Sequence, residues 1–125
     1  MKILGFHHVA VFTDNYTKSL DFYKALGGKV VHSFTSPSNG KEISLVELAP
    51  GAVVEIIQKP APKCEGSFPH LAIATDDCDG AFAAAVGAGA RVKSEVCQMT
   101  LGTMAVKNCF LYGPDEEILE FFQVL

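Results

Sequence analysis

The sequence contains one pattern twice, and this internal duplication constrains the fold more than any other feature. Residues 6–14 read FHHVAVFTD, and residues 68–76 read FPHLAIATD. Late in each copy a single acidic residue interrupts an apolar run, in VVEIIQ at 53–58 and in ILEFFQ at 118–123. We therefore expect two similar modules, each with the same order of strands and helices.

Each copy opens with a segment that predicts a β-strand. In the first copy Val9 alternates with His8 and Ala10, a period of two, and the second copy repeats this alternation from His70 onward. One face of the strand is expected to carry bulky apolar side chains beneath a helix. The opposite face should leave open space in front of the imidazole. By the same alternation, His7 is expected to point away from His8.

A helix is predicted next in each copy. In the first copy Asp14 is the expected N-cap and Gly27 the residue that ends the helix. In the second copy Asp76 or Asp77 is the expected N-cap, and Gly89 ends the helix.

Three further strands complete each copy, separated by turns that contain glycine and proline. They are expected at residues 29–34, 43–48 and 53–58, and at 91–96, 103–111 and 117–124. The predicted fold class is α+β, with two βαβββ modules in a curved mixed sheet, an open barrel-like cleft and the helices outside. A single domain over residues 1–125 would consist of module 1 (3–58) and module 2 (67–125). Because one module leaves a sheet face uncovered, the modules should pair, within one chain or between two chains.

Composition excludes several classes of partner. A net charge of −4 without clustered Lys or Arg argues against nucleic acid. No apolar run approaches the roughly 20 residues that span a bilayer, and no signal-peptide core is evident. The four cysteines lie far apart without a Cys-x-x-Cys pair, so we interpret them as reduced thiols of a cytoplasmic protein.

The paired histidines and glutamates, His8, Glu55, His70 and Glu120, predict a metal site. A carboxylate buried in an apolar strand costs several kcal/mol unless a cation pairs with it. For a single such Glu, a position on an edge strand that faces solvent would be the simpler interpretation. For a single strand His, a structural role would be the simpler interpretation. Because the His and the Glu both recur at matched positions of the two copies, chance is a poor explanation for their placement. Imidazole and carboxylate donors suit Ni²⁺, Zn²⁺, Fe²⁺ or Mn²⁺ rather than Ca²⁺.

Four protein ligands would leave two positions on a six-coordinate metal for water or substrate oxygens. A metal of this kind acts as a Lewis acid and acidifies a neighbouring C–H bond. A ligand carboxylate can detach and serve as general base. The predicted partner is therefore a small-molecule substrate.

The chain resembles the vicinal oxygen chelate superfamily over essentially its whole length. The resemblance is carried by HVAVFTD at 8–14, SLDFYKALG at 19–27, PHLAI at 69–73, and GPD at 113–115 leading into LEF at 119–121. Members of this superfamily include glyoxalase I, methylmalonyl-CoA epimerase, extradiol dioxygenases, fosfomycin-resistance enzymes and bleomycin-resistance proteins.

Glyoxalase I is the relative whose metal ligands read His, Glu, His, Glu, and His8, Glu55, His70 and Glu120 match that order. The resemblance implies an octahedral Ni²⁺ or Zn²⁺ site in a homodimer, with sites shared between subunits in small members. It also implies proton transfer through an enediolate held by the metal, in an α-oxo or α-hydroxy carbonyl compound such as a thiol hemithioacetal. Glu120 would be the favoured base, with Glu55 as its counterpart.

One difference from the glyoxalase I pattern leaves the identity of the substrate open. Glyoxalase I usually has an Arg four residues after the first ligand, which holds a carboxylate of glutathione, and this chain has Phe12 there. Alternatives within the superfamily are an epimerase, which usually has Gln at the position of Glu55, and an Fe²⁺ extradiol dioxygenase, which needs only His8, His70 and Glu120. A non-catalytic binding protein of the bleomycin-resistance kind is a further alternative, although such relatives typically lack the metal residues.

Overall fold

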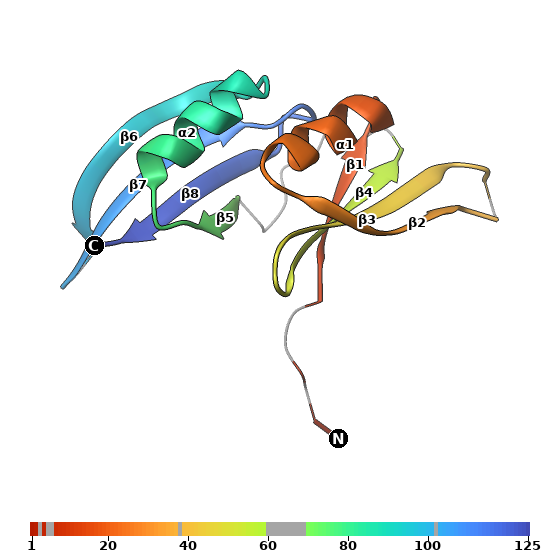
Figure 1. The fold of residues 1–125 in the computed structure, drawn as a ribbon, viewed down its shortest axis with the longest axis horizontal. Helices are drawn as coiled ribbons and strands as arrows, with labels where there is room; N and C mark the ends of the chain where they lie inside the picture. Colours follow the sequence, from red (N-terminus) through yellow and green to blue (C-terminus); the bar gives the residue numbers. More distant parts are fainter. Residues whose placement is uncertain (3, 5–6, 38, 60–69, 102) are drawn as a thin grey trace. The chain divides into compact units, whose positions relative to one another are not determined.

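The computed structural model describes residues 1–2, 4, 7–37, 39–59, 70–101 and 103–125. The chain forms two compact units, Met1–Pro62 and Lys63–Leu125. Within the described residues, each unit has the element order βαβββ (Figure 1). The predicted α+β class with two such modules is therefore confirmed.

The first unit is a four-stranded mixed sheet with one helix. Its elements are β1 (Val9–Thr13), α1 (Tyr16–Ala25), β2 (Lys29–Thr35), β3 (Glu42–Ala49) and β4 (Ala52–Gln58). The strands lie in the order β1-β4-β3-β2. The outer strand β1 runs parallel to β4, whereas the remaining neighbours are antiparallel.

The second unit repeats this topology. Its elements are β5 (Leu71–Ala74), α2 (Cys78–Gly87), β6 (Arg91–Leu101), β7 (Met104–Tyr112) and β8 (Ile118–Val124). The strand order is β5-β8-β7-β6, again with the first and last strands of the unit parallel. Neither α1 nor α2, the helices of the described residues, is long and apolar enough to cross a membrane.

Most strand boundaries agree with the predicted ones to within two residues, but β6 is longer than expected. The sequence predicts an end at residue 96, whereas the strand continues to Leu101. The extension forms because residues 97–101 pair with residues 104–108 of β7 in an antiparallel ladder. Tertiary hydrogen bonding thus extends a strand whose local pattern had no clear end.

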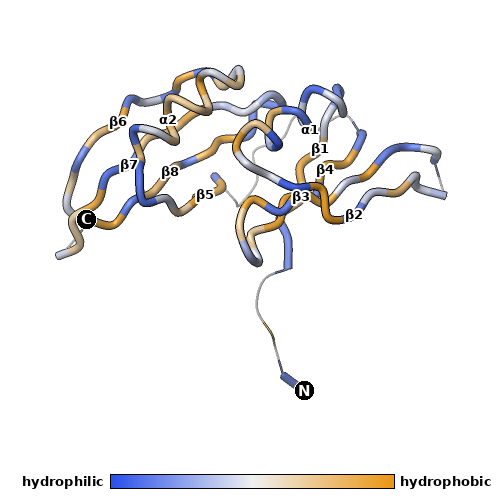
Figure 2. Tube along the Cα trace, viewed as in Figure 1, coloured by the Kyte–Doolittle hydropathy of each residue, from blue (hydrophilic) through white to orange (hydrophobic). Residues whose placement is uncertain are grey.

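Alternation along the central strands separates a helix-facing side from an open side. In β4, Val54 and Ile56 are buried, whereas the intervening Glu55 is only partly buried. The helix-facing side is identified by Ser44, whose hydroxyl contacts the phenol of Tyr16 in α1. Figure 2 shows that β4 and β8 are largely hydrophobic, which is the setting in which the sequence placed the two glutamates.

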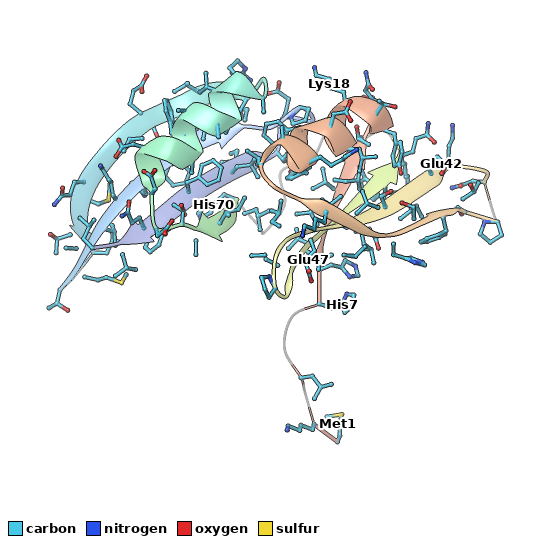
Figure 3. All side chains as sticks on the ribbon, viewed as in Figure 1. Met1, His7, Lys18, Glu42, Glu47 and His70 are labelled. Carbon is cyan, nitrogen blue, oxygen red and sulfur yellow. The ribbon has the colours of Figure 1, made fainter. Side chains whose placement is uncertain are left out.

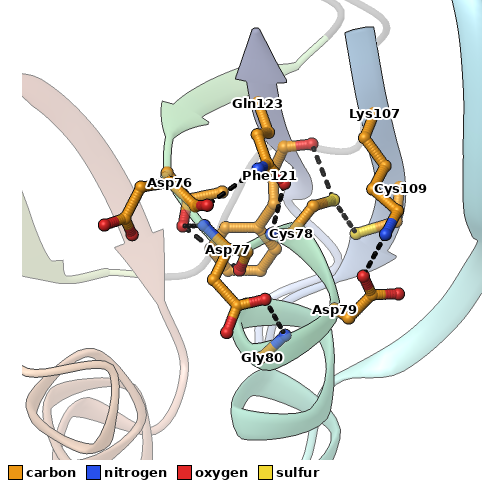
Figure 4. Close-up of polar contacts among 10 residues, drawn as sticks. Asp76, Asp77, Cys78, Asp79, Gly80, Lys107, Cys109, Phe121 and Gln123 are labelled. Atoms are coloured by element: carbon orange, nitrogen blue, oxygen red, sulfur yellow. Dashed lines mark hydrogen bonds and ion pairs between the residues drawn. The ribbon is translucent and has the colours of Figure 1, made fainter. Parts of the chain in front are cut away.

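The first helix begins one residue later than predicted. The expected N-cap Asp14 is exposed, and Asn15 takes the role instead, with its side chain accepting a hydrogen bond of 3.1 Å from the backbone N–H of Lys18. The shift arises because the Thr13 hydroxyl accepts from the Asn15 N–H at 3.0 Å. In the second unit Asp77 is the N-cap, one of the two predicted residues, and it accepts from the Gly80 N–H (Figure 4).

Both helices end in the same hydrogen-bonded turn. Gly27 and Gly89 have φ values of +94° and +104°, a conformation that L side chains rarely adopt. The N–H groups of residues 27 and 28 donate to the carbonyls of residues 24 and 23, and the second unit repeats this arrangement. This is the Schellman pattern, so the predicted glycine stops are confirmed.

Gly28 is required for close packing rather than for its φ. A Cβ added there would lie 2.6 Å from the Tyr23 carbonyl oxygen and 2.6 Å from Val46 Cγ1. We expect Gly28→Ala to lower the free energy of unfolding by about 1–3 kcal/mol, the usual cost of overpacking. Urea denaturation measures the change.

The matched control is Gly87→Ala at the end of α2, where an added Cβ meets nothing within 4 Å. Alanine is the better helix former, so this variant should be neutral or more stable by less than about 1 kcal/mol. Equal unfolding midpoints for the two variants would contradict the packing argument.

A pair of thiols joins α2 to its sheet at the place where unit 1 uses hydroxyl groups. Cys78 Sγ and Cys109 Sγ are 4.0 Å apart, and both residues are fully buried (Figure 4). Burial is the main cause that raises the pKa of the Cys78 thiol, and it raises the pKa of the Cys109 thiol to about 12. Cys97 is exposed, and these three cysteines are free thiols, while Cys64 lies outside the described residues.

These environments predict selective alkylation. With iodoacetamide at pH 8 we expect Cys97 to react while Cys78 and Cys109 stay unmodified, because the reactive thiolate is disfavoured at the buried sites. Peptide-resolved mass spectrometry of the labelled protein measures the modification. In urea all three should react, and prompt labelling of Cys109 in the folded protein would show that the buried pair is not held as described.

Because of the raised pKa of Cys109, the free energy of unfolding should fall as the pH rises into the alkaline range, and urea denaturation at several pH values measures this. The pKa of the Cys109 thiol is higher in the folded state than its ordinary value of 9.0. The stabilisation that the neutral Cys109 thiol gives the folded state is therefore complete below about pH 9, and it is lost as the pH rises toward about 12.

Candidate metal centre

The parallel pairing of β1 with β4 brings the first histidine to the first glutamate. Ala10 of β1 lies opposite Glu55 of β4 in the ladder, and His8 lies two residues before Ala10. His8 Nε2 is 3.6 Å from Glu55 Oε2. Ala10 is exposed, so a small side chain leaves space beside the imidazole, as the sequence predicted. Val9, expected beneath a helix, is instead 46% exposed at the start of β1.

The second unit repeats this pairing in the same register. Ala72 of β5 lies opposite Glu120 of β8, and His70 lies two residues before Ala72. His70 Nε2 is 3.1 Å from Glu120 Oε2. Figure 3 labels His70 at the start of β5. Each unit therefore brings together its own predicted His and Glu.

The separation of the donor atoms suits a shared metal ion. Zinc–nitrogen and zinc–oxygen bonds are about 2.0–2.2 Å, so two adjacent ligand atoms on one ion lie roughly 3.0–3.4 Å apart. The distances of 3.1 Å and 3.6 Å are close to that range. Neutral imidazole and carboxylate are also the donor types that borderline divalent cations take. The residues present thus fit the cation that the sequence predicted.

The two glutamates lie in unequal surroundings. The Glu55 side chain is 21% exposed and that of Glu120 is 9% exposed. Asn108 Nδ2 of β7 donates a hydrogen bond of 2.8 Å to Glu120 Oε1. Because a buried carboxylate requires compensation, the amide satisfies one of its oxygens, and a cation beside His70 would compensate the other.

The two histidines also differ in their contacts with residues other than the glutamates. The His70 ring packs edge-on against Phe110, with ring centroids 5.4 Å apart. His8 is next to His7, whose Nδ1 lies 2.8 Å from His8 Nδ1. The prediction that His7 points away from His8 is therefore wrong. Strand alternation does not apply there, because β1 begins only at Val9.

Within either unit, the described residues gather no group of three or more His, Cys, Asp or Glu side chains that could hold a metal ion. Each unit thus supplies two donors, one nitrogen and one oxygen. Two donors are fewer than the four to six ligands that such a metal takes.

Sequence reasoning missed two functional candidates near the predicted residues. Asn108 has no repeat partner and lies in an apolar strand, so nothing in its local pattern distinguishes it from an ordinary core amide. Lys59 Nζ lies over the Phe12 ring, 5.1 Å from its centroid. A positive charge is therefore present beside the position where the resemblance led us to expect Arg.

The chain belongs to the Glyoxalase/Bleomycin resistance protein/Dioxygenase superfamily, since the model of that family matches residues 5–121. This confirms the resemblance found in the sequence. No curated protein matches the chain significantly.

Several solved structures share the fold. The glyoxalase family protein from Enterococcus faecalis is 22% identical with a TM-score of 0.76, and the match covers 98% of this chain and 99% of that chain. The trypanothione-dependent glyoxalase I of Leishmania major is 21% identical with a TM-score of 0.71, over 94% of this chain and 84% of that chain. A glyoxalase I mutant from Zea mays is 18% identical with a TM-score of 0.74, over 93% of this chain and 43% of that chain. At these identities the similarity is one of fold.

Proposed function

We propose that this member of the superfamily is a metal-dependent lyase or isomerase of the glyoxalase I kind, with an α-oxo or α-hydroxy carbonyl compound as substrate. The observation that carries the proposal is the repeated His–Glu pair, His8 with Glu55 and His70 with Glu120, held in one register in both units. A duplicated acid–imidazole pair on an apolar sheet face is costly to build without a cation.

The four side chains His8, Glu55, His70 and Glu120 would hold the ion. Ni²⁺ or Zn²⁺ suits two imidazoles and two carboxylates best, and Fe²⁺ or Mn²⁺ is the alternative. When bound, such an ion supplies Lewis acidity that polarises a substrate carbonyl and acidifies the adjacent C–H. Two of the solved structures that share this fold carry the name glyoxalase I.

The protein's own part in the reaction is to move a proton between neighbouring carbons. Glu120 and Glu55 are the bases, because carboxylate oxygens lie beside both imidazoles and can reach a substrate held in front of them. Glu120 is the favoured base, as the resemblance implies. The partly buried residues around Glu55, Leu45 in β3 and Val53 and Ile57 in β4, form an apolar wall that limits water.

The complete site is expected in a homodimer, with the two donor pairs coming from different chains. Each sheet has a helix on one face, and exposed apolar side chains on the strands β2 and β6 favour a protein partner. They are Val30, Val31, Phe34, Val92, Met99 and Leu101. A cytoplasmic location remains part of this proposal.

The substrate class is narrowed by Phe12 and Lys59. Lys59 can attract a carboxylate but, as a point charge, does not reproduce the two-pronged contact of Arg. We therefore expect a smaller thiol adduct or a free α-hydroxy ketone to be preferred over the glutathione hemithioacetal.

A second candidate function is Fe²⁺-dependent dioxygenation. It is favoured by the looser environment of Glu55, since a set of two His and one carboxylate would need only His8, His70 and Glu120. Oxygen consumption by the Fe²⁺-loaded protein would support it over proton transfer.

Metal binding and proton exchange test the first proposal together. Purified protein should bind Ni²⁺ or Zn²⁺, and Glu55→Gln, Glu120→Gln, His8→Ala and His70→Ala should each weaken binding at least about tenfold. In D₂O the loaded protein should exchange the α-proton of a bound α-hydroxy ketone, followed by NMR. Glu120→Gln should slow that exchange by about 10²–10⁴-fold, the usual contribution of a general base.

The matched control is Glu47→Gln, which removes an acid of β3 outside both pairs and should change neither measurement. Exchange that fails with every metal would contradict the lyase or isomerase proposal. A metal-free protein that binds an aromatic ligand would favour sequestration of the bleomycin-resistance kind.

Subunit complementation tests the shared site. One variant carries His8→Ala with Glu55→Gln, and the other carries His70→Ala with Glu120→Gln. Each alone should be inactive, whereas unfolding and refolding them together should restore exchange, because a mixed dimer regains one intact set. Recovery up to about a quarter of the wild-type sites follows from random assortment of two chains. A folded mixture without any recovery would place both pairs in one chain.

A further inference from the structure

A row of polar side chains crosses the sheet of unit 2 and ends at the metal-site pair. Cys97 of β6 donates its S–H to Asn108 Oδ1 of β7, at 3.4 Å. Asn108 Nδ2 donates to Glu120 Oε1 of β8 at 2.8 Å. Glu120 Oε2 then lies 3.1 Å from His70 Nε2. The row connects residues of β6, β7 and β8 with the residue before β5.

The direction of these contacts fixes the orientation of the carboxylate. The oxygen of the Asn108 amide is occupied by the thiol, so its nitrogen is the group that faces Glu120. A carboxylate only accepts hydrogen bonds, which matches this arrangement. Asn108 is 5% exposed, so water competes little for the contact. One Glu120 oxygen is thereby occupied, and the other is presented to His70.

Unit 1 lacks this row at the equivalent positions. Ile43 pairs with Ile57 two residues beyond Glu55, just as Asn108 pairs with Phe122 two residues beyond Glu120. Phe34 is opposite Ile43, where unit 2 has Cys97 opposite Asn108. Among the described residues, the polar contact of Glu55 is His8 alone, at 3.6 Å. Unit 1, with apolar residues at these positions, therefore serves as an internal control for the polar row of unit 2.

We propose that Asn108 is a positioning residue that pre-organises the His70–Glu120 pair for the metal and makes Glu120 a one-oxygen ligand. The inference rests on the proposed metal function. Groups that hydrogen-bond to a ligand orient it and strengthen metal binding, and their removal typically costs 10–100-fold in affinity. A hydrogen bond to a charged acceptor is among the stronger ones, and burial makes its loss more costly. Among the described residues, the His8–Glu55 pair has no amide in the equivalent place.

The test uses the full chain and Co²⁺, which reports its own coordination by its visible absorption. Asn108→Leu keeps a similar volume and removes both hydrogen bonds of the amide. We expect it to weaken Co²⁺ binding by about 10–100-fold and to change the Co²⁺ spectrum at saturation. Ile43→Leu, the matched change in unit 1, should leave affinity and spectrum unaltered.

Two further variants separate positioning from packing. Asn108→Gln retains an amide and should recover part of the affinity lost in Asn108→Leu. Ile43→Asn introduces an amide beside Glu55 and should strengthen Co²⁺ binding. Circular dichroism checks that each variant is folded, and Ile43→Asn decides the question if Asn108→Leu does not fold.

The outcomes distinguish this inference from the function on which it rests. Wild-type protein that binds no divalent cation would overturn the proposed function. Wild-type protein that binds Co²⁺, with a folded Asn108→Leu variant of the same affinity and spectrum, would overturn the role of Asn108 and leave the function standing. An unchanged Ile43→Asn variant would likewise count against positioning by the amide.

Discussion

The parallel pairing between the first and last strand of each unit is the interaction on which the site depends. It sets Ala10 opposite Glu55 and Ala72 opposite Glu120, and the histidine two residues before each Ala then reaches the carboxylate. A slip of one residue would turn the glutamate to the helix-facing side. The βαβββ order makes this pairing possible, because the three strands after the helix follow one another across the sheet and bring the last strand beside the first.

The two copies retain the donor pairs but differ elsewhere. On the helix-facing side, unit 1 joins its helix to β3 through the hydroxyl groups of Tyr16 and Ser44, whereas unit 2 uses the buried thiols of Cys78 and Cys109. On the open side, among the residues that the structure describes, unit 2 alone has an amide beside its glutamate. The two His–Glu pairs are therefore alike in residue type and unequal in their hydrogen bonding and exposure.

Much of the fold could be predicted because local signals and the duplication agreed. The period-two strands and the glycine helix stops lie where the pattern indicated, since Gly27 and Gly89 take a backbone conformation that other residues avoid. The errors arose where a neighbouring contact changed a local preference. The Thr13 hydroxyl moved the N-cap to Asn15, and His7 lies beyond the end of β1, where alternation has no meaning.

The duplication was enough to predict the two-module α+β fold and the four candidate ligands, because repetition makes matched His and Glu positions recognisable without knowledge of their neighbours in space. Which His meets which Glu became clear from the folded chain, since that depends on the strand register between segments about 50 residues apart. The folded chain also shows that Asn108 holds Glu120 while Glu55 stays more exposed. A hydrogen bond across β7 and β8 depends on strand pairing and burial, and neither leaves a mark at a single Asn in the chain.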